Sequence, residues 1–565
     1  MNASASAPAS STPLLNDEPD RARPGPIRSA QRSLPDINAN ADADTDASTA
    51  DLSRFFESGI ISSSWEAFND PRTTRIVFIG TDVANLYHLV RNNELPKSNS
   101  LHYPFSVIQE ELPWIPKPGL SRHSYITADI INDLKSCPTR PVRDALVDTY
   151  FTDIHPGFPI IDRAKFYQQY MDPKDPPPLL IFNCVLLAAA RISDHPMVAA
   201  SRLTVTATLY RRAKALFDVR YENDRLNLVQ AALLLASHTE NADTVGSNAY
   251  YWVGTAVRTA FGLGMHRGGL LGYHLPCEAV TIKLYRKVWW SLVHAEVFLA
   301  LEFGRPCMIR AEDFDTAGLT DDDFNKFDGS GDETVNRDFC EVMANLCLLV
   351  LDILNQRAVR SKEKEKAANN SAIDNRLAEI GFLISPRHDF WSCQLRINYH
   401  LVVLILNRTR KEPDTSSLCS EAASNILTTF ESMVVQGTIR QCHQSSSTAL
   451  VAAAIQFSKD VESALAKNSV MTAVSAHAQL QRLLAPAEAL SNYWPNIVAS
   501  CRLFKSLSAR AEILIKGRQH ANANVPSEMD ITWQDIMPDY QMPDLGSGLG
   551  VEDWMNSFSS GSLFQ

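Results

Sequence analysis

Two signatures of small metal-binding and redox modules are missing from this 565-residue sequence. Its ten cysteines run from Cys137 to Cys501, and no two of them have C-x-x-C spacing. The spacing therefore excludes a zinc ribbon and a thioredoxin-like motif. Because the cysteines are scattered over mainly apolar segments, we expect reduced thiols in the core of a cytosolic or nuclear protein.

Signals for secretion and for membrane insertion are also missing. The N-terminal residues MNASASAPASST contain no apolar segment of the kind that a secretory signal needs. The longest apolar runs, such as Leu401–Leu406, are far too short to span a bilayer, so we expect no membrane partner. The formal net charge of −11 argues against a chain that coats nucleic acid along its length, although a local basic module stays open.

The sequence contains no phosphate-binding G-x-x-x-x-G-K-[ST] loop, no H-E-x-x-H helix and no G-x-S-x-G elbow. Residues Gly262–Gly268 resemble a dinucleotide loop, but they follow a helical pattern and are predicted to end a helix. The acidic triplet Asp321–Asp323 would suit a diphosphate–Mg²⁺ site. It lies in a stretch rich in Gly and Asp, which predicts a solvated loop instead. We therefore predict that the chain is not an enzyme and has no catalytic or metal-binding residues.

The most informative stretch runs from Leu284 to Asp315 and reads LYRKVWWSLVHAEVFLALEFGRPCMIRAEDFD. Its apolar residues recur at three- and four-residue spacing around most of a helix, which predicts a helix inside a large helical body. Gly304 is predicted to end this helix in a left-handed turn, and Pro306 cannot continue it. Arg305 stands between them, where we expect it to bond the last helical carbonyls or an acidic neighbour such as Asp313.

Helical periodicity continues over most of the chain and predicts a mainly α fold. We expect residues 121–518 to form a large regulatory domain of stacked antiparallel helices, between disordered termini. Residues 1–50 are of low complexity and form a disordered arm. Residues 51–120 are predicted as an extended linker packed on the helical body, because four prolines between 104 and 118 exclude regular structure there.

The last segment, Gln519–Gln565, has no Lys or Arg and alternates acidic with aromatic residues. This composition is typical of an activation segment that offers its aromatic side chains to a groove on a coactivator. The alternative is an acidic tail without a partner. The aromatic candidates are Trp533, Tyr540, Trp554 and Phe558.

Several histidines and aromatic residues stand in or beside apolar helices. We predict that the histidines are hydrogen-bonded core or helix-end residues, because no second metal ligand follows at i+3 or i+4. His294 is expected on the polar strip of the central helix beside Glu296, where a carboxylate would control its charge. Trp252, His294 and Phe298 are candidates for the wall of an apolar effector pocket, with a purely structural core as the alternative.

Several blocks, taken in order, resemble the middle homology region of fungal-specific transcription factors of the cutinase-factor type. The central block is a basic residue, WWSL, an apolar helix, GRP-x-MI and an acidic D-F-D. It is preceded by H-P-x-F-P-I-x-D-R and followed by a helix with a Tyr-His pair. The family often has Asp-Arg where this chain has Ala295-Glu296, so the pairing there must differ. The signature residues are His155, Pro156, Trp289, Trp290, Gly304, Arg305, Pro306, Tyr399 and His400.

The resemblance covers residues 75–410. It implies a nuclear transcriptional regulator, most simply an activator of RNA polymerase II genes, that responds to an inducer and works with a coactivator or the transcription machinery. DNA would be engaged directly or through a partner, with homo- or heterodimers possible.

Members of the family usually hold two zinc ions with six N-terminal cysteines. Since no cysteine precedes Cys137, we expect no zinc in this chain and no specific DNA binding by these residues alone. Zinc is expected only if a further N-terminal cysteine cluster exists. The alternative is a helical interaction or co-regulator protein that does not itself bind DNA.

Overall fold

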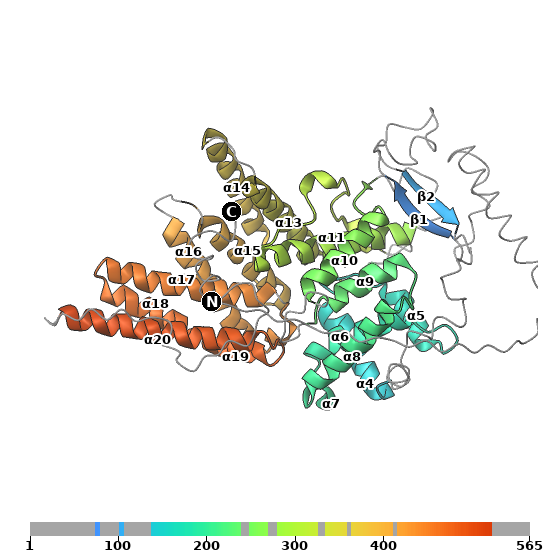
Figure 1. Cartoon of the computed structure of the whole chain (residues 1–565), viewed down its shortest axis with the longest axis horizontal. Helices are drawn as coiled ribbons and strands as arrows, with labels where there is room; N and C mark the ends of the chain where they lie inside the picture. The colour runs from blue at the N-terminus through green and yellow to red at the C-terminus, as the bar shows by residue number, and fades with distance from the viewer. Residues whose placement is uncertain are drawn as a thin grey trace, which may run out of the picture.

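The structure is a computed structural model. It describes residues 74–79, 101–106, 137–238, 248–268, 279–325, 334–358, 363–408, 410, 415–443 and 445–522. The predicted arm of residues 1–50 and the candidate tail aromatics Trp533, Tyr540, Trp554 and Phe558 lie outside these ranges. Helices make up most of the described residues, which confirms the mainly α fold class (Figure 1). Among the described helices, none is long and apolar enough to cross a membrane.

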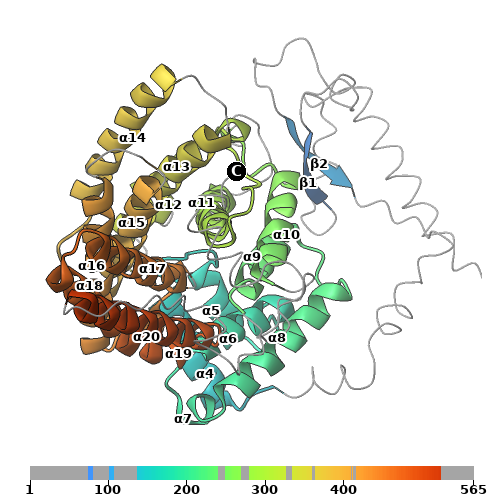
Figure 2. The ribbon, with the colours of Figure 1, turned by 60° about the vertical axis from the view of Figure 1, so that its left-hand side comes forward.

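Two short strands precede the helices. β1 (Thr74–Ile79) pairs antiparallel with β2 (Leu101–Ser106), and β1 lies close to α10 (Ala249–Gly262) (Figure 2). Pro104 lies inside β2 opposite Ile76, so the prediction that prolines exclude regular structure from residue 104 was wrong at this position. A two-stranded ribbon leaves each strand with one open edge, where a residue without an N–H loses no ladder bond.

The first group of helices packs around an almost completely buried member, α6. Every residue of α6 from Leu180 to Ile192 is buried, and α6 contacts α4, α8 and α9. Asp162 begins α5 by accepting a bond from the Lys165 N–H at 3.0 Å. The group comprises α4 (Arg140–Thr149), the π-helix η2 (Tyr150–Ile154), α5 (Arg163–Met171), α6 (Leu179–Ile192), α7 (Pro196–Ala199), α8 (Arg202–Asp218), α9 (Arg225–Leu235) and α10.

The central helix, α11 (Ala279–Phe303), is surrounded by other helices, as Figure 2 shows in a view close to its axis. Val288, Trp289 and Val297 on this helix are completely buried. Gly304 follows with a φ of +58°, which confirms the predicted left-handed end. The guanidinium of Arg305 lies over the ring of Tyr250 on α10, 4.7 Å from its centroid, so this helix end is anchored to a neighbouring helix.

The acidic triplet after α11 is helical and not the loop that its composition predicted, although Asp321 and Asp322 are exposed to solvent as expected. Residues Asp321–Phe324 form the short helix α12, preceded by the one-turn helix η4 (Ala311–Asp313). Asp323 is buried, caps α12 by accepting a bond from the Thr320 N–H at 2.9 Å, and pairs with Arg286 at 2.8 Å. The prediction failed because the partner of Asp323 stands on α11, far outside the local pattern.

The second group of helices continues the stack toward the C-terminus (Figure 1). α15 packs along α16, α17 packs along α18, and α20 lies across α17, α18 and α19. α20 extends to Asn522, past the Gln519 at which the tail was expected to begin. The group comprises α13 (Arg337–Ala358), α14 (Glu363–Leu383), α15 (Phe390–Arg408), α16 (Thr415–Val435), η5 (Ile439–Gln441), α17 (Ser445–Ala466), α18 (Val470–Arg482), α19 (Leu484–Ser491) and α20 (Ile497–Asn522).

Candidate functional site

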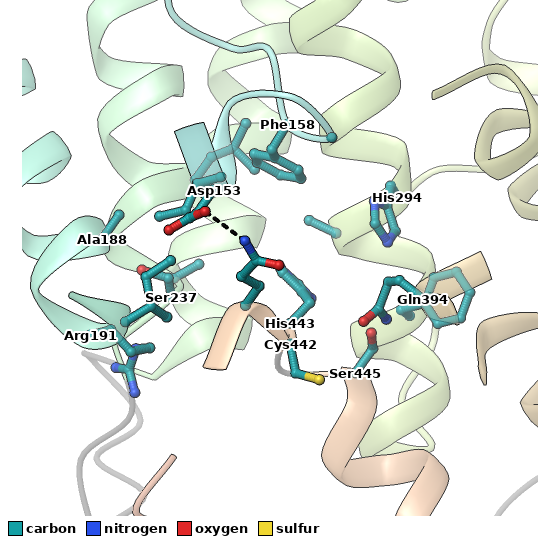
Figure 3. Close-up of a pocket in the computed structure, with 18 of the residues that line it drawn as sticks. Asp153, Phe158, Ala188, Arg191, Ser237, His294, Gln394, Cys442, His443 and Ser445 are labelled. Atoms are coloured by element: carbon teal, nitrogen blue, oxygen red, sulfur yellow. Dashed lines mark hydrogen bonds between the residues drawn. The ribbon is translucent and has the colours of Figure 1, made fainter. Parts of the chain in front are cut away.

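A cavity of about 120 Å³ lies where the first group of helices and α11 meet the second group. We call it the seam cavity. One wall comes from η2, α6 and α9 of the first group together with α11, and the opposite wall comes from α15, the segment around η5, the start of α17 and Trp494. Figure 3 shows His294, Gln394 and Ser445 on one side, Asp153, Ser237 and Arg191 on the other, and Cys442 and His443 between them.

Two local features of the backbone shape the cavity. Gly157, in the H-P-x-F-P block, lies so close to the ring of Trp391 that a Cβ at this position would stand 2.1 Å from a ring carbon. Gly437, with a φ of +69°, follows α16 and lets the chain turn back into η5. These glycines therefore bring the second-group segment with Arg440, Gln441 and His443 against the first group.

A polar cluster around Asp153 holds η5 against the first group of helices. Arg440 pairs with the buried carboxylate of Asp153 at 2.8 Å and with Asp194 at 3.4 Å. The same Asp153 accepts a bond from the side-chain amide of Gln441 at 2.5 Å, drawn as the dashed line in Figure 3. Arg440 also donates to the Ile192 carbonyl at 3.2 Å. These contacts join segments almost 300 residues apart in the chain, since Asp153 and Gln441 are separated by 288 positions.

Arg191, near the end of α6, is a buried cation in the cavity wall. Its guanidinium stacks on Trp494 at 4.1 Å from the centroid and donates to the Tyr493 carbonyl at 3.1 Å. No described carboxylate forms an ion pair with it. Burial lowers the pKa of Arg191 to about 9, with the positive charge of Arg202 as the second cause, so it stays charged at pH 7.

Two histidines meet at the other side of the cavity. The rings of His294 and His443 lie 5.7 Å apart between centroids, and Phe158 contacts both, at 6.1 Å from each. Burial lowers the pKa of His294 to about 3, with His443 as the second cause. Burial likewise lowers the pKa of His443 to about 4, followed by the charge of Arg191. Both imidazoles are therefore neutral at pH 7.

The prediction that His294 lies on a polar strip under the control of a carboxylate was wrong. His294 is only 6% exposed, and the titratable group that contributes to its pKa shift is the imidazole of His443. Its Nε2 atom and the Nδ1 atom of His443 are buried without a hydrogen-bond partner. His294 faces the second group of helices instead of solvent, which the periodicity of one helix cannot reveal.

A buried polar network lies next to the histidines, between α15 and α17. Ser446 donates to the Gln394 side-chain carbonyl at 3.1 Å, and Ser445 donates to the Asn398 side-chain carbonyl at 3.4 Å. The Gln394 amide also donates to Asn398 at 3.4 Å. All four side chains are buried, so this side of the cavity is both polar and held in place.

The predicted effector-pocket residues are only partly brought together. His294 and Phe298 belong to the seam cavity, whereas Trp252 is buried elsewhere and donates to the Tyr210 hydroxyl at 2.9 Å. Sequence reasoning missed Arg191 and His443. Arg191 carried a signal, because it is a lone charge in the apolar run LLIFNCVLLAAARIS and buried charges are rare. His443 stands in the polar run QCHQSSS, which offers no such signal.

The signature residues of the central block support α11 and the loop after it. Trp289 is fully buried, and Trp290 donates to the Ala317 carbonyl at 2.9 Å. Glu296 is buried and accepts a bond from the Met308 N–H at 2.6 Å, which ties the GRPCMI segment to the helix. Burial raises the pKa of Glu296. Pro306 lies in the turn that follows Gly304, between the end of α11 and Met308.

The other signature residues also have structural surroundings. His155 is buried 5.2 Å from the ring of Phe151, and the Pro156 carbonyl accepts a bond from Asn336 at 2.8 Å. Burial raises the pKa of Tyr399 and lowers that of His400 to about 4. In the part of the chain that the structure describes, no three His, Cys, Asp or Glu side chains are grouped to hold a metal ion.

Comparison with known proteins concerns the sequence blocks that form α11 and the helices around it. Residues 147–389 match the model of the fungal specific transcription factor domain. That domain begins in α4, includes η2, α6 and all of α11, and ends just before α15. It therefore supplies one wall of the seam cavity, whereas Gln394 and His443 lie beyond its end.

Several curated proteins are similar to this chain over a stretch longer than that domain. The acetamidase regulatory protein of Aspergillus fumigatus is 32% identical over 457 residues, which cover 77% of this chain and 56% of that protein. The acetamidase regulatory protein of Emericella nidulans is 31% identical over 456 residues, covering 77% and 54%. Cutinase transcription factor 1 alpha of Fusarium vanettenii is 29% identical over 399 residues, covering 65% and 43%. The chain thus spans about half the length of the acetamidase regulatory proteins it matches.

Proposed function

We propose that this chain is a transcriptional regulator that acts in the nucleus and activates genes transcribed by RNA polymerase II. The observation that carries this proposal is the fungal specific transcription factor domain at residues 147–389. Relatives named as regulators and transcription factors add support, because their similarity extends beyond that domain. In this proposal the helical body is the regulatory part, and other segments contact DNA partners and the transcription machinery.

The activating segment in this proposal is Gln519–Gln565, whose acidic and aromatic residues suit a coactivator groove. Fused to an unrelated DNA-binding domain, this segment should activate a reporter gene. The combined W533A, W554A and F558A substitutions should abolish activation without changing the charge. The matched control replaces Ser547, Ser557 and Ser559 by Ala in the same segment and should retain activation. Full activity of the aromatic triple variant would contradict the proposal for this segment.

We further propose that DNA is reached through a partner, a dimer or a separate zinc module, because no cysteine precedes Cys137 in the 565 residues. Zinc analysis and a mobility-shift assay on the purified chain at about 0.15 M salt test this, since non-specific electrostatic binding is weak there. Stoichiometric zinc or sequence-specific binding by the chain alone would contradict it. If the chain in cells is neither recruited to DNA nor activates a reporter gene, the result would favour a co-regulator without a DNA target.

A further inference from the structure

The seam cavity contains hydrogen-bonding atoms that no described residue uses. Nε2 of His294 and Nδ1 of His443 are buried, lack partners and belong to side chains in the cavity wall. Buried polar atoms in folded proteins are nearly always paired, because an unpaired one loses its bonds to water without replacement. Two such atoms on rings 5.7 Å apart therefore indicate that a bound molecule completes their hydrogen bonding.

The charges around the cavity favour an anion beside these histidines. Arg191 is a buried cation without a carboxylate partner among the described residues, and its charge acts on His443. The negative charge of Asp153 is already matched by Arg440. The Cys442 thiol stays neutral, because burial raises its pKa to about 12.

Glu302 is the other carboxylate in the cavity wall. It stands in the last turn of α11, eight residues after His294, which is roughly 12 Å along the helix axis. Its backbone is therefore about two helical turns away from that of His294. Near the histidines, the remaining charge is the positive charge of Arg191. The two neutral imidazoles there can donate N–H bonds.

We infer that the seam cavity binds a small organic monocarboxylate, whose carboxylate accepts hydrogen bonds from the imidazoles of His294 and His443. The apolar part of the molecule packs on the aromatic wall formed by Phe158, Phe298 and Trp391. A cavity of 150 Å³ accommodates benzene, so about 120 Å³ accommodates an apolar body of roughly five carbon atoms. A branched short-chain acid fits this description.

The position of the cavity makes such a ligand a regulator. His294 stands on α11 and His443 between η5 and α17, so a carboxylate bonded to both holds α11 and the second group of helices together. A ligand that binds only this arrangement stabilises it over others. This regulatory role rests on the proposed function, whereas binding to the purified chain is measured without any transcription.

The test compares isovalerate with isovaleramide, its neutral counterpart of nearly equal shape, by titration calorimetry on the purified 565-residue chain at pH 6. We expect isovalerate to bind with a dissociation constant on the order of a millimolar, as a ligand of this size allows. Isovaleramide should bind at least about tenfold more weakly, because it lacks the charge. Two buffers with different ionisation enthalpies should show uptake of part of a proton with isovalerate, since a bound carboxylate favours the charged imidazoles.

Four variants locate the binding, each with its melting temperature recorded. His294→Gln should weaken isovalerate binding about tenfold and reduce proton uptake. Ala295→Leu should block binding by filling the cavity without removing a polar group. Glu302→Gln should retain or tighten binding, because it removes a negative charge. His400→Gln is the matched control: burial also lowers the pKa of His400 to about 4, but this residue lies outside the cavity.

Equal affinity for the acid and the amide would overturn the inference, as would the absence of saturable isovalerate binding. Isovalerate binding that survives both His294→Gln and Ala295→Leu in folded protein would place the ligand elsewhere and also overturn it. Reporter assays separate this failure from failure of the proposed function. Intact activation without isovalerate binding refutes only the ligand site, and intact binding without activation refutes only the transcriptional role.

Discussion

His294 on α11 and His443 beside η5 place their imidazole rings 5.7 Å apart, across the contact between α11 and the second group of helices. Burial lowers the pKa of both rings, to about 3 and about 4. The ordinary histidine pKa in an unfolded chain is about 6.5. The unfolded chain therefore binds more protons than the folded chain between these values, so folding stability rises with pH in this window.

This linkage predicts acid destabilisation that depends on His294. As the pH falls from about 6.5 toward 3, each such histidine should lower the free energy of unfolding by up to about 1.4 kcal/mol per pH unit. The His294→Gln variant should show a shallower pH dependence by about that slope. Urea unfolding at several pH values between 7 and 4 measures it. Identical slopes for the variant and the wild type would show that His294 is not held neutral by burial.

A double-mutant cycle should detect the pair of Asp153 and Arg440. With Asp153→Asn and Arg440→Gln, we expect a coupling energy near 2 kcal/mol, because the Asp153 carboxylate is buried and also bonds Gln441. The matched control is the exposed pair of Glu431 and Arg482, whose N–O distance is 2.5 Å. Its coupling should be about 0.5 kcal/mol or less, since water screens it. Equal coupling in both cycles would mean that the cavity pair is as weakly coupled as a surface pair.

Trp289 should be the most sensitive of the signature residues to truncation. It is completely buried on α11, and its Nε1 atom has no hydrogen-bond partner. Trp289→Ala should lower the free energy of unfolding by about 3–5 kcal/mol through lost burial and a new cavity. Trp289→Phe should cost much less, because it keeps most of the ring and removes the unpaired N–H. Chemical denaturation compares the two, and a similar loss in both would point to a polar role for the indole.

Breaking the pair of Arg286 and Asp323 should cost more than replacing it. Asp323→Asn leaves the largely buried Arg286 without its carboxylate and should lower the free energy of unfolding by about 3 kcal/mol. The double variant Arg286→Met and Asp323→Asn should recover part of that loss, because no buried charge remains unpaired. Denaturant unfolding measures both. A double variant less stable than Asp323→Asn alone would contradict the assumption that the unpaired cation causes the loss.

The sequence alone determined the features that depend on near neighbours. The repeat of apolar residues in the central block predicted the burial of α11, because a helix brings residues three and four apart onto one face. Gly304 predicted the end of that helix, because a left-handed turn there disfavours side chains with a Cβ. The cap at the start of α5 is equally local, since Asp162 accepts the bond of a residue only three positions later.

Only the tertiary structure decided which polar residues meet. His294 was expected on a strip under carboxylate control, and Asp323 in a solvated loop, but each is buried against a partner from a distant segment. Arg191 binds the Tyr493 carbonyl 302 positions away. The sequence pattern of one helix indicates which side chains are polar and on which face of the helix they lie. Whether that face meets water, a cation or a cavity depends on how the other helices pack, since the burial and charge that shift a pKa come from residues distant in sequence.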